Sequence, residues 1–264
     1  MLLLIDVGNT NIVMGIYDGD DMKYSWRLGT RVSRTSDEYG LQVDSILRHY
    51  GLTIEDIDDV IIASVVPSMQ HTLKNMCIKY FNIDAMVVGE GTKTGMKIKS
   101  DNPKEVGADR IVNSVAAIKK YGGPALLVDI GTAISFDVIN EKGEYLGGAI
   151  APGIGIAAEA LFSRTSKLPK IELEEPKQVI GKNTVEAMQS GIVYGFIGLV
   201  DNVIKNMLEE LKLTRNDVKI VATGGYAKLI ASKSEYITEY DYEITLYGMK
   251  TIYDMTIKDR NEKK

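Results

Sequence analysis

Apolar and polar residues alternate in three short segments at the start of the chain. Residues 2–6 form an apolar run, residues 11–18 alternate apolar with small or polar side chains, and residues 22–28 alternate again after the turn Asp18-Gly19-Asp20-Asp21. A period of two is typical of half-buried strands, and a polar turn typically joins two of them. The pattern therefore predicts three consecutive antiparallel strands.

A helix is predicted after these strands. It is bounded by an N-cap at Ser36 and a stop at Gly51. Its apolar residues keep helical spacing at Leu41, Val43, Ile46 and Leu47. Strands at 60–65 and 85–88 then flank a second helix, which Pro67 opens. The first half is thus predicted to run strand, strand, strand, helix, strand, helix, strand.

The second half of the chain repeats this order. Residues 126–133 match residues 3–10, because both are apolar runs that end in Asp-x-Gly and a polar residue. Further strands and helices are predicted at 134–139, 144–151, 154–162, 185–211 and 219–222, with a last helix after Gly224-Gly225. A repeat this long predicts two similar domains rather than an array. We therefore expect an α/β protein with domains at 1–121 and 122–264 that hold a ligand in a central cleft.

Composition and charge exclude several classes of protein. The chain has 264 residues, of which 45% are hydrophobic and 25% charged, so it is an ordinary globular sequence. Its formal net charge of -5 lacks the basic footprint of a protein that binds a phosphate backbone. We therefore expect no nucleic-acid partner.

Two further features concern location. Cys77 is the only cysteine and has apolar neighbours at helical spacing, which predicts a core residue in a reducing compartment. The apolar start of the chain has no basic leader, and the weakly charged stretch 147–162 is too short, and too interrupted by Pro152 and Glu159, to cross a membrane. The sequence therefore predicts a cytoplasmic protein without a membrane partner.

The first candidate site is the turn Asp6-Val7-Gly8-Asn9-Thr10-Asn11. Gly8 permits a tight turn whose backbone N–H groups and polar side chains suit phosphate oxygens. Asp6 would repel a phosphate unless a cation lies between them, so we assign Asp6 to Mg²⁺, through water. A solvated hairpin turn is the simpler alternative for one such motif. The second copy, Asp129-Ile130-Gly131-Thr132, favours a phosphate clamp instead.

A second candidate lies at the start of a predicted helix that runs to about residue 120. Gly107 allows close approach of a ligand, Asp109 can accept a hydroxyl proton, and Arg110 offers a planar fork for a carboxylate. A carboxylate that stabilises the helix N-terminus, beside a surface arginine, is an equally simple interpretation. The residues by themselves leave both open.

Other motifs compete with these two. Residues 153–158 match the dinucleotide fingerprint G-x-G-x-x-A, but the region lacks a predicted strand-helix-strand unit. Residues 181–184 are not a P-loop, because Pro176 stands where the first glycine belongs. His49 and His71 have no metal-binding partners nearby in the sequence, so zinc sites and histidine triads are not expected.

Taken together, the motifs resemble one known family. They are, in chain order, DVGNTN, VGADRIVN, DIGTA, GGAIAPG, SRTSKLP, IGKNT and ATGG, and they extend from residue 1 to about residue 255. They resemble the type III pantothenate kinases, members of the actin-like and sugar-kinase superfamily. The resemblance implies two ribonuclease H-like (actin-like ATPase) domains with a central cleft, in agreement with the repeat.

The resemblance also implies a reaction and its cofactors. The reaction is transfer of the ATP γ-phosphate to the primary hydroxyl of pantothenate, which gives 4'-phosphopantothenate in the first step of coenzyme A biosynthesis. Mg²⁺ and a monovalent cation, K⁺ or NH₄⁺, are the implied cofactors. A homodimer is the implied assembly.

Site residues are implied by the same resemblance. Asp109 matches the general base, and Asp129 matches the ligand of the monovalent cation. The implied ATP contacts are Asp6, Val7, Gly8, Asn9, Thr10, Asn11, Ile12, Val13 and Thr132. The implied pantothenate contacts are Gly107, Ala108, Asp109, Arg110 and Thr184.

One residue departs from the family pattern. Ser100 stands where the family commonly has a tyrosine, ahead of Asn102-Pro103, and this change affects an implied pantothenate contact. Two alternative functions stay open at this point. One is a kinase for another small hydroxy or carboxy acceptor, and the other is a regulatory accessory protein of the same fold that binds nucleotide without turnover.

Overall fold

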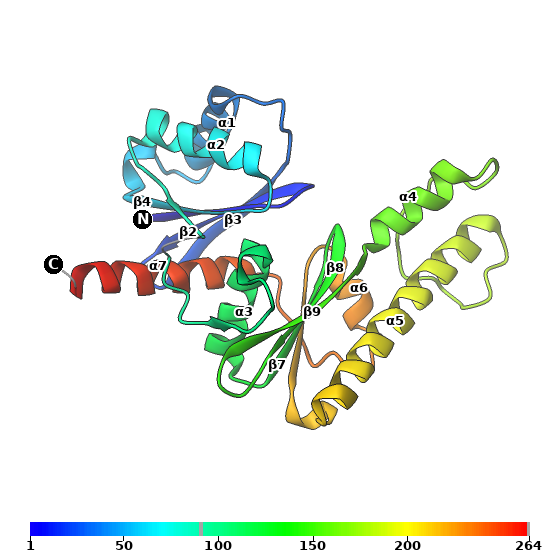
Figure 1. Ribbon diagram of the computed structural model, residues 1–264. Helices are drawn as coiled ribbons and strands as arrows, with labels where there is room; N and C mark the ends of the chain where they lie inside the picture. The colour runs from blue at the N-terminus through cyan, green and yellow to red at the C-terminus, as the bar shows by residue number, and fades with distance from the viewer. Residues whose placement is uncertain (90–91, 263–264) are drawn as a thin grey trace. The chain divides into compact units, whose positions relative to one another are not determined.

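The computed structural model describes residues 1–89 and 92–262 as an α/β chain with two compact units (Figure 1). Unit 1 comprises Met1–Gly95, Lys104–Ala116 and Thr245–Lys264, and unit 2 comprises Met96–Pro103 and Ala117–Ile244. Each unit has its own sheet and its own hydrophobic core.

Unit 1 is built on a five-stranded sheet of order β3-β2-β1-β4-β5. Its strands are β1 (Leu2–Val7), β2 (Asn11–Asp18), β3 (Asp21–Gly29), β4 (Asp59–Ser64) and β5 (Met86–Val87). β1, β2 and β3 form an antiparallel meander, whereas β4 runs parallel to β1. The three predicted N-terminal strands and their antiparallel order are confirmed.

Helices cover both faces of this sheet. Figure 1 shows α1 (Ser36–His49) and α2 (Pro67–Met76) side by side over one face, where Val43, Leu47 and Leu73 join the core. On the other face α7 (Ile244–Glu262) packs so closely that a Cβ on Gly15 would lie 2.8 Å from Leu246 Cδ1. Burial on both faces explains why β1 reads as a continuous apolar run rather than an alternating one.

Unit 2 repeats the arrangement on a six-stranded sheet of order β11-β10-β7-β8-β9-β6. Its strands are β6 (Lys97–Ile98), β7 (Ala125–Ile130), β8 (Ala133–Ile139), β9 (Glu144–Pro152), β10 (Lys219–Thr223) and β11 (Glu239–Tyr240). β7, β8 and β9 are antiparallel, and β10 runs parallel to β7 as β4 does to β1. The repeat predicted from the two Asp-x-Gly motifs is therefore confirmed at the level of topology.

The core of unit 2 lies between this sheet and its helices. The helices of the second half are α4 (Ile154–Arg164), α5 (Thr184–Leu211) and α6 (Ala227–Ala231). α5 is long and apolar enough to cross a membrane by length and composition alone. Its buried residues, among them Val193, Val200 and Ile204, belong to the same hydrophobic core as Phe136 of β8, which is the environment of a core helix.

The remaining helix, α3 (Ala108–Tyr121), passes from unit 1 to unit 2 at Ala116 and Ala117. The compact units thus share most of their residues with the predicted halves 1–121 and 122–264, but the C-terminal helix belongs with the first of them. The domain boundaries stay a prediction.

Local details differ from the sequence prediction at the first helix. Its N-cap is Thr35, one residue before the predicted Ser36, because Thr35 and Glu38 form a reciprocal capping box. Ser36 is instead the first helical residue.

Cys77 is buried as predicted, and burial raises the pKa of its thiol to about 12. A thiol with so high a pKa is protonated at neutral pH and is a poor nucleophile.

Candidate functional site

The first acidic turn joins β1 to β2. The Gly8 N–H donates to the Asn11 carbonyl at 2.9 Å and closes the turn, which leaves the side chains of Asn9, Thr10 and Asn11 exposed. Asp6 lies just before the turn and is half-buried. A concentration of exposed polar groups beside a carboxylate is what a site for a phosphate and a hydrated cation requires.

Three apolar residues of the predicted ATP segment lie on β1 and β2 rather than in the exposed turn. Val7 and Ile12 are fully buried and belong to the core of unit 1, and Val13 faces away from that core on the half-covered side of β2. Val7 and Ile12 can therefore offer a ligand only their backbone groups. The polar chemistry of this segment belongs to Asp6 and to the turn residues.

Asp109 is the second residue of α3. Its Oδ1 accepts the backbone N–H of Arg110 at 2.8 Å, and its position in the first turn favours a negative charge near the helix N-terminus. Arg110 beside it is half-buried. A Cβ on Gly107 would lie 2.4 Å from Asp109 Oδ1, so the space that glycine leaves open is used by the Asp109 carboxylate itself.

Asp109 and the Asp6 turn lie at the same edge of the unit 1 sheet. The Val65 N–H donates to the Val7 carbonyl at 3.1 Å, so the residue after β4 is fixed beside the end of β1. The α carbon of Gly107 packs near this residue, since a Cβ there would lie 3.9 Å from Val65 Cγ1. Contacts within unit 1 therefore place both the end of β1, which carries Asp6, and Gly107, which precedes Asp109, beside Val65.

The third carboxylate, Asp129, is at the end of β7 in unit 2. It lies opposite Ser135 on β8 and opposite Thr223 on β10. The turn after it is closed by the Gly131 N–H, which donates to the Ala133 carbonyl at 3.0 Å, and Thr132 is exposed at its tip. Asp129 and Thr132 thus repeat the polar edge that Asp6 and Thr10 form in unit 1.

Two glycines that are distant in the sequence pack against this second turn. A Cβ on Gly224 would lie 2.5 Å from Asp129 Oδ1, and a Cβ on Gly153 would lie 2.1 Å from the Thr132 carbonyl oxygen. Gly224 also has a φ of +98°, a backbone conformation that favours glycine. No sequence pattern predicts this position for either glycine, because only the folded chain places them against the turn.

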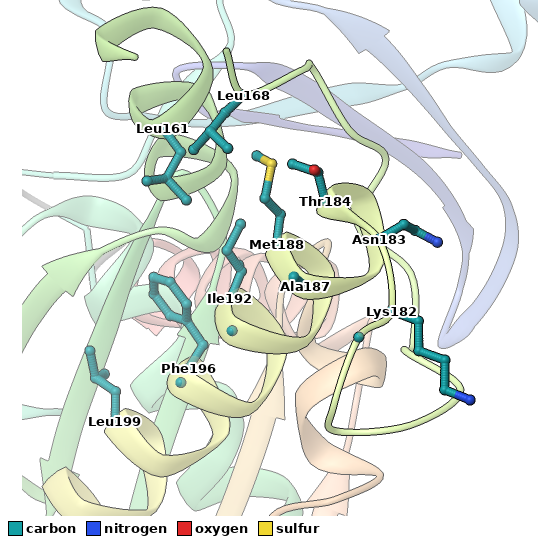
Figure 2. A pocket seen from close by; sticks show the side chains of 13 residues that line it. Leu161, Leu168, Lys182, Asn183, Thr184, Ala187, Met188, Ile192, Phe196 and Leu199 are labelled. Atoms are coloured by element: carbon teal, nitrogen blue, oxygen red, sulfur yellow. The ribbon is translucent and has the colours of Figure 1, made fainter. Parts of the chain in front are cut away.

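Thr184, an implied pantothenate contact, is the first residue of α5. Asn183 caps this helix, since its side-chain oxygen accepts the Glu186 N–H at 2.9 Å. Figure 2 shows Thr184 at one end of an apolar groove of about 740 Å³ that lies between α4, the segment after it and α5. The large apolar side chains labelled along the groove are Leu161, Leu168, Met188, Ile192, Phe196 and Leu199.

Other sequence candidates are removed by topology. The G-x-G-x-x-A run does follow a strand, β9, and does open a helix, α4, but the next strand in the chain, β10, pairs with β7 and β11 rather than with β9. A dinucleotide-binding unit needs that parallel neighbour. Within residues 1–89 and 92–262, no group of three His, Cys, Asp or Glu side chains is arranged to hold a metal.

Solved structures share this fold at low sequence identity. The activator of 2-hydroxyisocaproyl-CoA dehydratase from Clostridium difficile, with bound ADPNP, matches with a TM-score of 0.56 at 14% identity, over 99% of this chain and 97% of that one. The ethanolamine utilization protein EutJ from Carboxydothermus hydrogenoformans matches with a TM-score of 0.56 at 13% identity, over 95% and 89%. The chain therefore has the α/β fold of these proteins, the actin-like ATPase fold with two ribonuclease H-like units.

Sequence comparison then identifies the family. Residues 2–206 match the type III pantothenate kinase family. The type III pantothenate kinase of Geobacillus kaustophilus is 52% identical over 254 residues, which is 96% of this chain and 97% of the relative. That of Finegoldia magna is 52% identical over 259 residues, 98% and 99% of the two chains. The chain belongs to the type III pantothenate kinase family.

The contact between Gly107 and Asp109 leads to a test. Gly107→Ala places a methyl group where Asp109 Oδ1 now lies, so the carboxylate must move. We expect kcat for pantothenate phosphorylation to fall about ten- to a hundredfold, because a displacement of about 1 Å is enough for such losses. Steady-state kinetics with a coupled assay for ADP measure this. Gly198→Ala, at an exposed position of α5 that meets no atom within 4 Å, is the matched control. An unchanged kcat in Gly107→Ala would show that the position of the Asp109 carboxylate does not matter for the reaction.

Proposed function

We propose how the described residues carry out the reaction of the family, the ATP-dependent phosphorylation of pantothenate that begins coenzyme A biosynthesis. The observation that carries the proposal is that the end of β1, where the Asp6 turn begins, and Gly107, which precedes Asp109, both lie beside Val65 at one edge of the unit 1 sheet. Phosphoryl transfer depends mainly on positioning and on the stabilisation of charge, and this edge supplies amide donors and carboxylates from rigid elements.

The β1–β2 turn binds the ATP phosphates in this proposal. Gly8, Asn9, Thr10 and Asn11 offer backbone and side-chain donors at the end of a buried strand. Thr132, exposed on the corresponding turn of unit 2, is the further ATP contact. The match to a solved structure that holds ADPNP supports a nucleotide site in this fold.

Asp6 holds Mg²⁺, through water. Mg²⁺ is usually bound by one or two carboxylates together with phosphate oxygens and water, and a single half-buried Asp6 beside a phosphate-binding turn fits that donor set. When bound, Mg²⁺ neutralises charge that develops on the transferred phosphoryl group. The Asp6 carboxylate, which would bind this water, has a fixed position because β1 is paired with a strand on each side.

Asp109 accepts the proton of the pantothenate primary hydroxyl. Its Oδ1 accepts the Arg110 N–H and lies in the space that Gly107 leaves open, so the carboxylate has a fixed direction at the start of α3. In a loose transition state the proton leaves late, and a carboxylate of modest basicity suffices as the base. Ala108, Arg110 and Thr184 are the further pantothenate contacts, and Arg110 suits the carboxylate of that substrate.

Asp109→Asn tests the base directly. The amide keeps the size of the side chain but cannot take the proton, so we expect kcat to fall by about two to four powers of ten while both substrates still bind. Single-turnover kinetics measure the chemical step, and calorimetry measures binding. Asp18→Asn, an exposed aspartate at the other end of β2, is the control. Turnover close to the parent in Asp109→Asn removes Asp109 from this role.

Asp129 binds the monovalent cation, K⁺ or NH₄⁺. Its carboxylate is half-buried at the end of β7 and lies close to the Ile130 carbonyl, since a Cβ on Gly224 would be within 2.7 Å of both. A monovalent cation needs an anionic oxygen and carbonyl oxygens to offset the loss of its water. The Asp129 carboxylate and the Ile130 carbonyl beside Gly224 supply both kinds of oxygen.

Asp129→Ala removes the anionic oxygen from this position. We expect the K⁺ concentration for half-maximal activity to rise about tenfold or the activation to disappear. Initial rates in a K⁺ titration at saturating ATP and pantothenate measure the change. If the titration curves of variant and parent coincide, the cation is bound elsewhere.

We also propose a homodimer that covers the groove between α4 and α5. This part of unit 2 exposes large apolar side chains, and the groove itself is mostly apolar. The exposed apolar side chains of this part of unit 2 are Ile156, Leu161, Phe162, Val179, Ile180 and Val185. Exposed apolar surface in one contiguous region is typical of a protein interface.

The cytoplasm is the proposed location, and the one buried cysteine is suited to its reducing conditions.

Phe162→Glu tests this interface. A buried charge without a partner is costly, so we expect the variant to sediment as a monomer at concentrations at which the parent is a dimer. Sedimentation velocity measures the assembly state. Ile78→Glu, which changes an exposed apolar residue of unit 1, is expected to leave the dimer intact. A parent that sediments as a monomer contradicts the proposal.

A further inference from the structure

Thr30 makes two hydrogen bonds to the first acidic turn from the far side of the meander. It is the residue immediately after β3, and its hydroxyl donates to the Gly8 carbonyl at 2.7 Å. Its backbone N–H donates to the Thr10 carbonyl at 2.9 Å. Both ends of the turn are thus bonded to a single residue that is distant in the sequence.

These bonds determine where the turn directs its donors. A peptide group is planar and trans, so its N–H points away from the carbonyl oxygen of the same group. When Thr30 fixes the Gly8 carbonyl, it therefore also fixes the direction of the Asn9 N–H, on the opposite side of that peptide. The Gly8 N–H is already used to close the turn. The Asn9 N–H is therefore the first turn amide whose aim depends on the Thr30 hydroxyl.

The second turn has no such hydroxyl at the corresponding position. Asn11 pairs with Gly29, which places Thr10 opposite Thr30, and Ala133 pairs with Pro152, which places Thr132 opposite Gly153. Gly153 packs its bare α carbon directly on the Gly131 and Thr132 carbonyls. The second turn is also one residue shorter, since Ile130 pairs with Ile134 whereas Val7 pairs with Ile12. The longer first turn is held by hydrogen bonds, and the shorter second turn by close packing.

A flexible glycine turn needs such a restraint if its amides are to act as fixed donors. Gly8 has more conformational freedom than any other residue would have at that position. A preorganised donor costs nothing to reorient when the ligand binds, whereas a free one must be ordered at that moment. The side chain of Thr30 is half-buried and the residue lies outside β3, so a purely structural contribution of its hydroxyl is that of one ordinary hydrogen bond.

We propose that Thr30 is a positioning residue for nucleotide binding, and that its hydroxyl aims the Asn9 N–H at an ATP phosphate. This inference rests on the proposed function of the β1–β2 turn as the phosphate site. Thr30 itself does not touch the phosphate; it acts through the Gly8 carbonyl.

Thr30→Val and Thr30→Ser together test the proposal. Valine keeps the shape and the backbone N–H but removes the hydroxyl, whereas serine keeps the hydroxyl. We expect Thr30→Val to raise KM for ATP and the dissociation constant of a non-hydrolysable ATP analogue about three- to tenfold, the worth of one hydrogen bond. KM for pantothenate is expected to stay unchanged, and Thr30→Ser is expected to restore ATP binding to within about twofold.

Two further measurements separate the possible outcomes. Urea unfolding followed by the fluorescence of Trp26, which lies on β3, shows whether Thr30→Val changes only stability. A loss of stability with unchanged ATP binding overturns the proposal, and so does weak ATP binding in both the valine and serine variants, because the hydroxyl that serine keeps would then not be enough to support binding. Asn9→Pro, which removes the backbone N–H itself, serves as the reference for the turn.

If Asn9→Pro weakens binding of the ATP analogue and Thr30→Val does not, the turn is the phosphate site but Thr30 does not position it. If neither substitution weakens binding, the turn is not the phosphate site, and the proposed function of the turn fails together with the inference.

Discussion

Burial of the two central strands on both faces is the constraint on which the structure depends. β1 and β7 carry apolar side chains in nearly every position, so they can present polar groups only toward their ends. Asp6 and Asp129 each lie near the carboxyl end of their strand, and each is followed by a glycine turn into the next antiparallel strand. The position of each carboxylate is therefore a direct result of how its sheet packs. A side chain on a mobile loop would have no comparable definition.

The local parts of the fold could be predicted from the sequence because each depends on a short pattern. The alternation over residues 11–28 specified β2 and β3, and the repeated Asp-x-Gly motif predicted that both units have the same topology. The motifs were also specific enough to indicate the family. The same patterns located Asp6, Asp109 and Asp129, since each stands where an apolar strand ends or a helix begins.

What the sequence could not show depends on contacts between distant residues. Nothing around Thr30, Gly153 or Gly224 indicates that these residues pack against an acidic turn, since the strand register brings them there. The inclusion of α7 in unit 1 follows from packing such as that of Leu246 on Gly15, which no local pattern records. The N-cap of α1 was misplaced by one residue because Thr35 and Ser36 are both good caps, and only the bond to Glu38 distinguishes them.

The burial of Cys77 makes the chain convenient for spectroscopy. Its thiol lies in the core of unit 1 and is protonated under ordinary conditions, so thiol-directed dyes and spin labels react with it poorly while the protein is folded. A cysteine introduced at the surface would be the one accessible thiol, with no need to remove the native residue. Pairs of such labels, one in each unit, would report the distance between the two units in solution, with and without nucleotide.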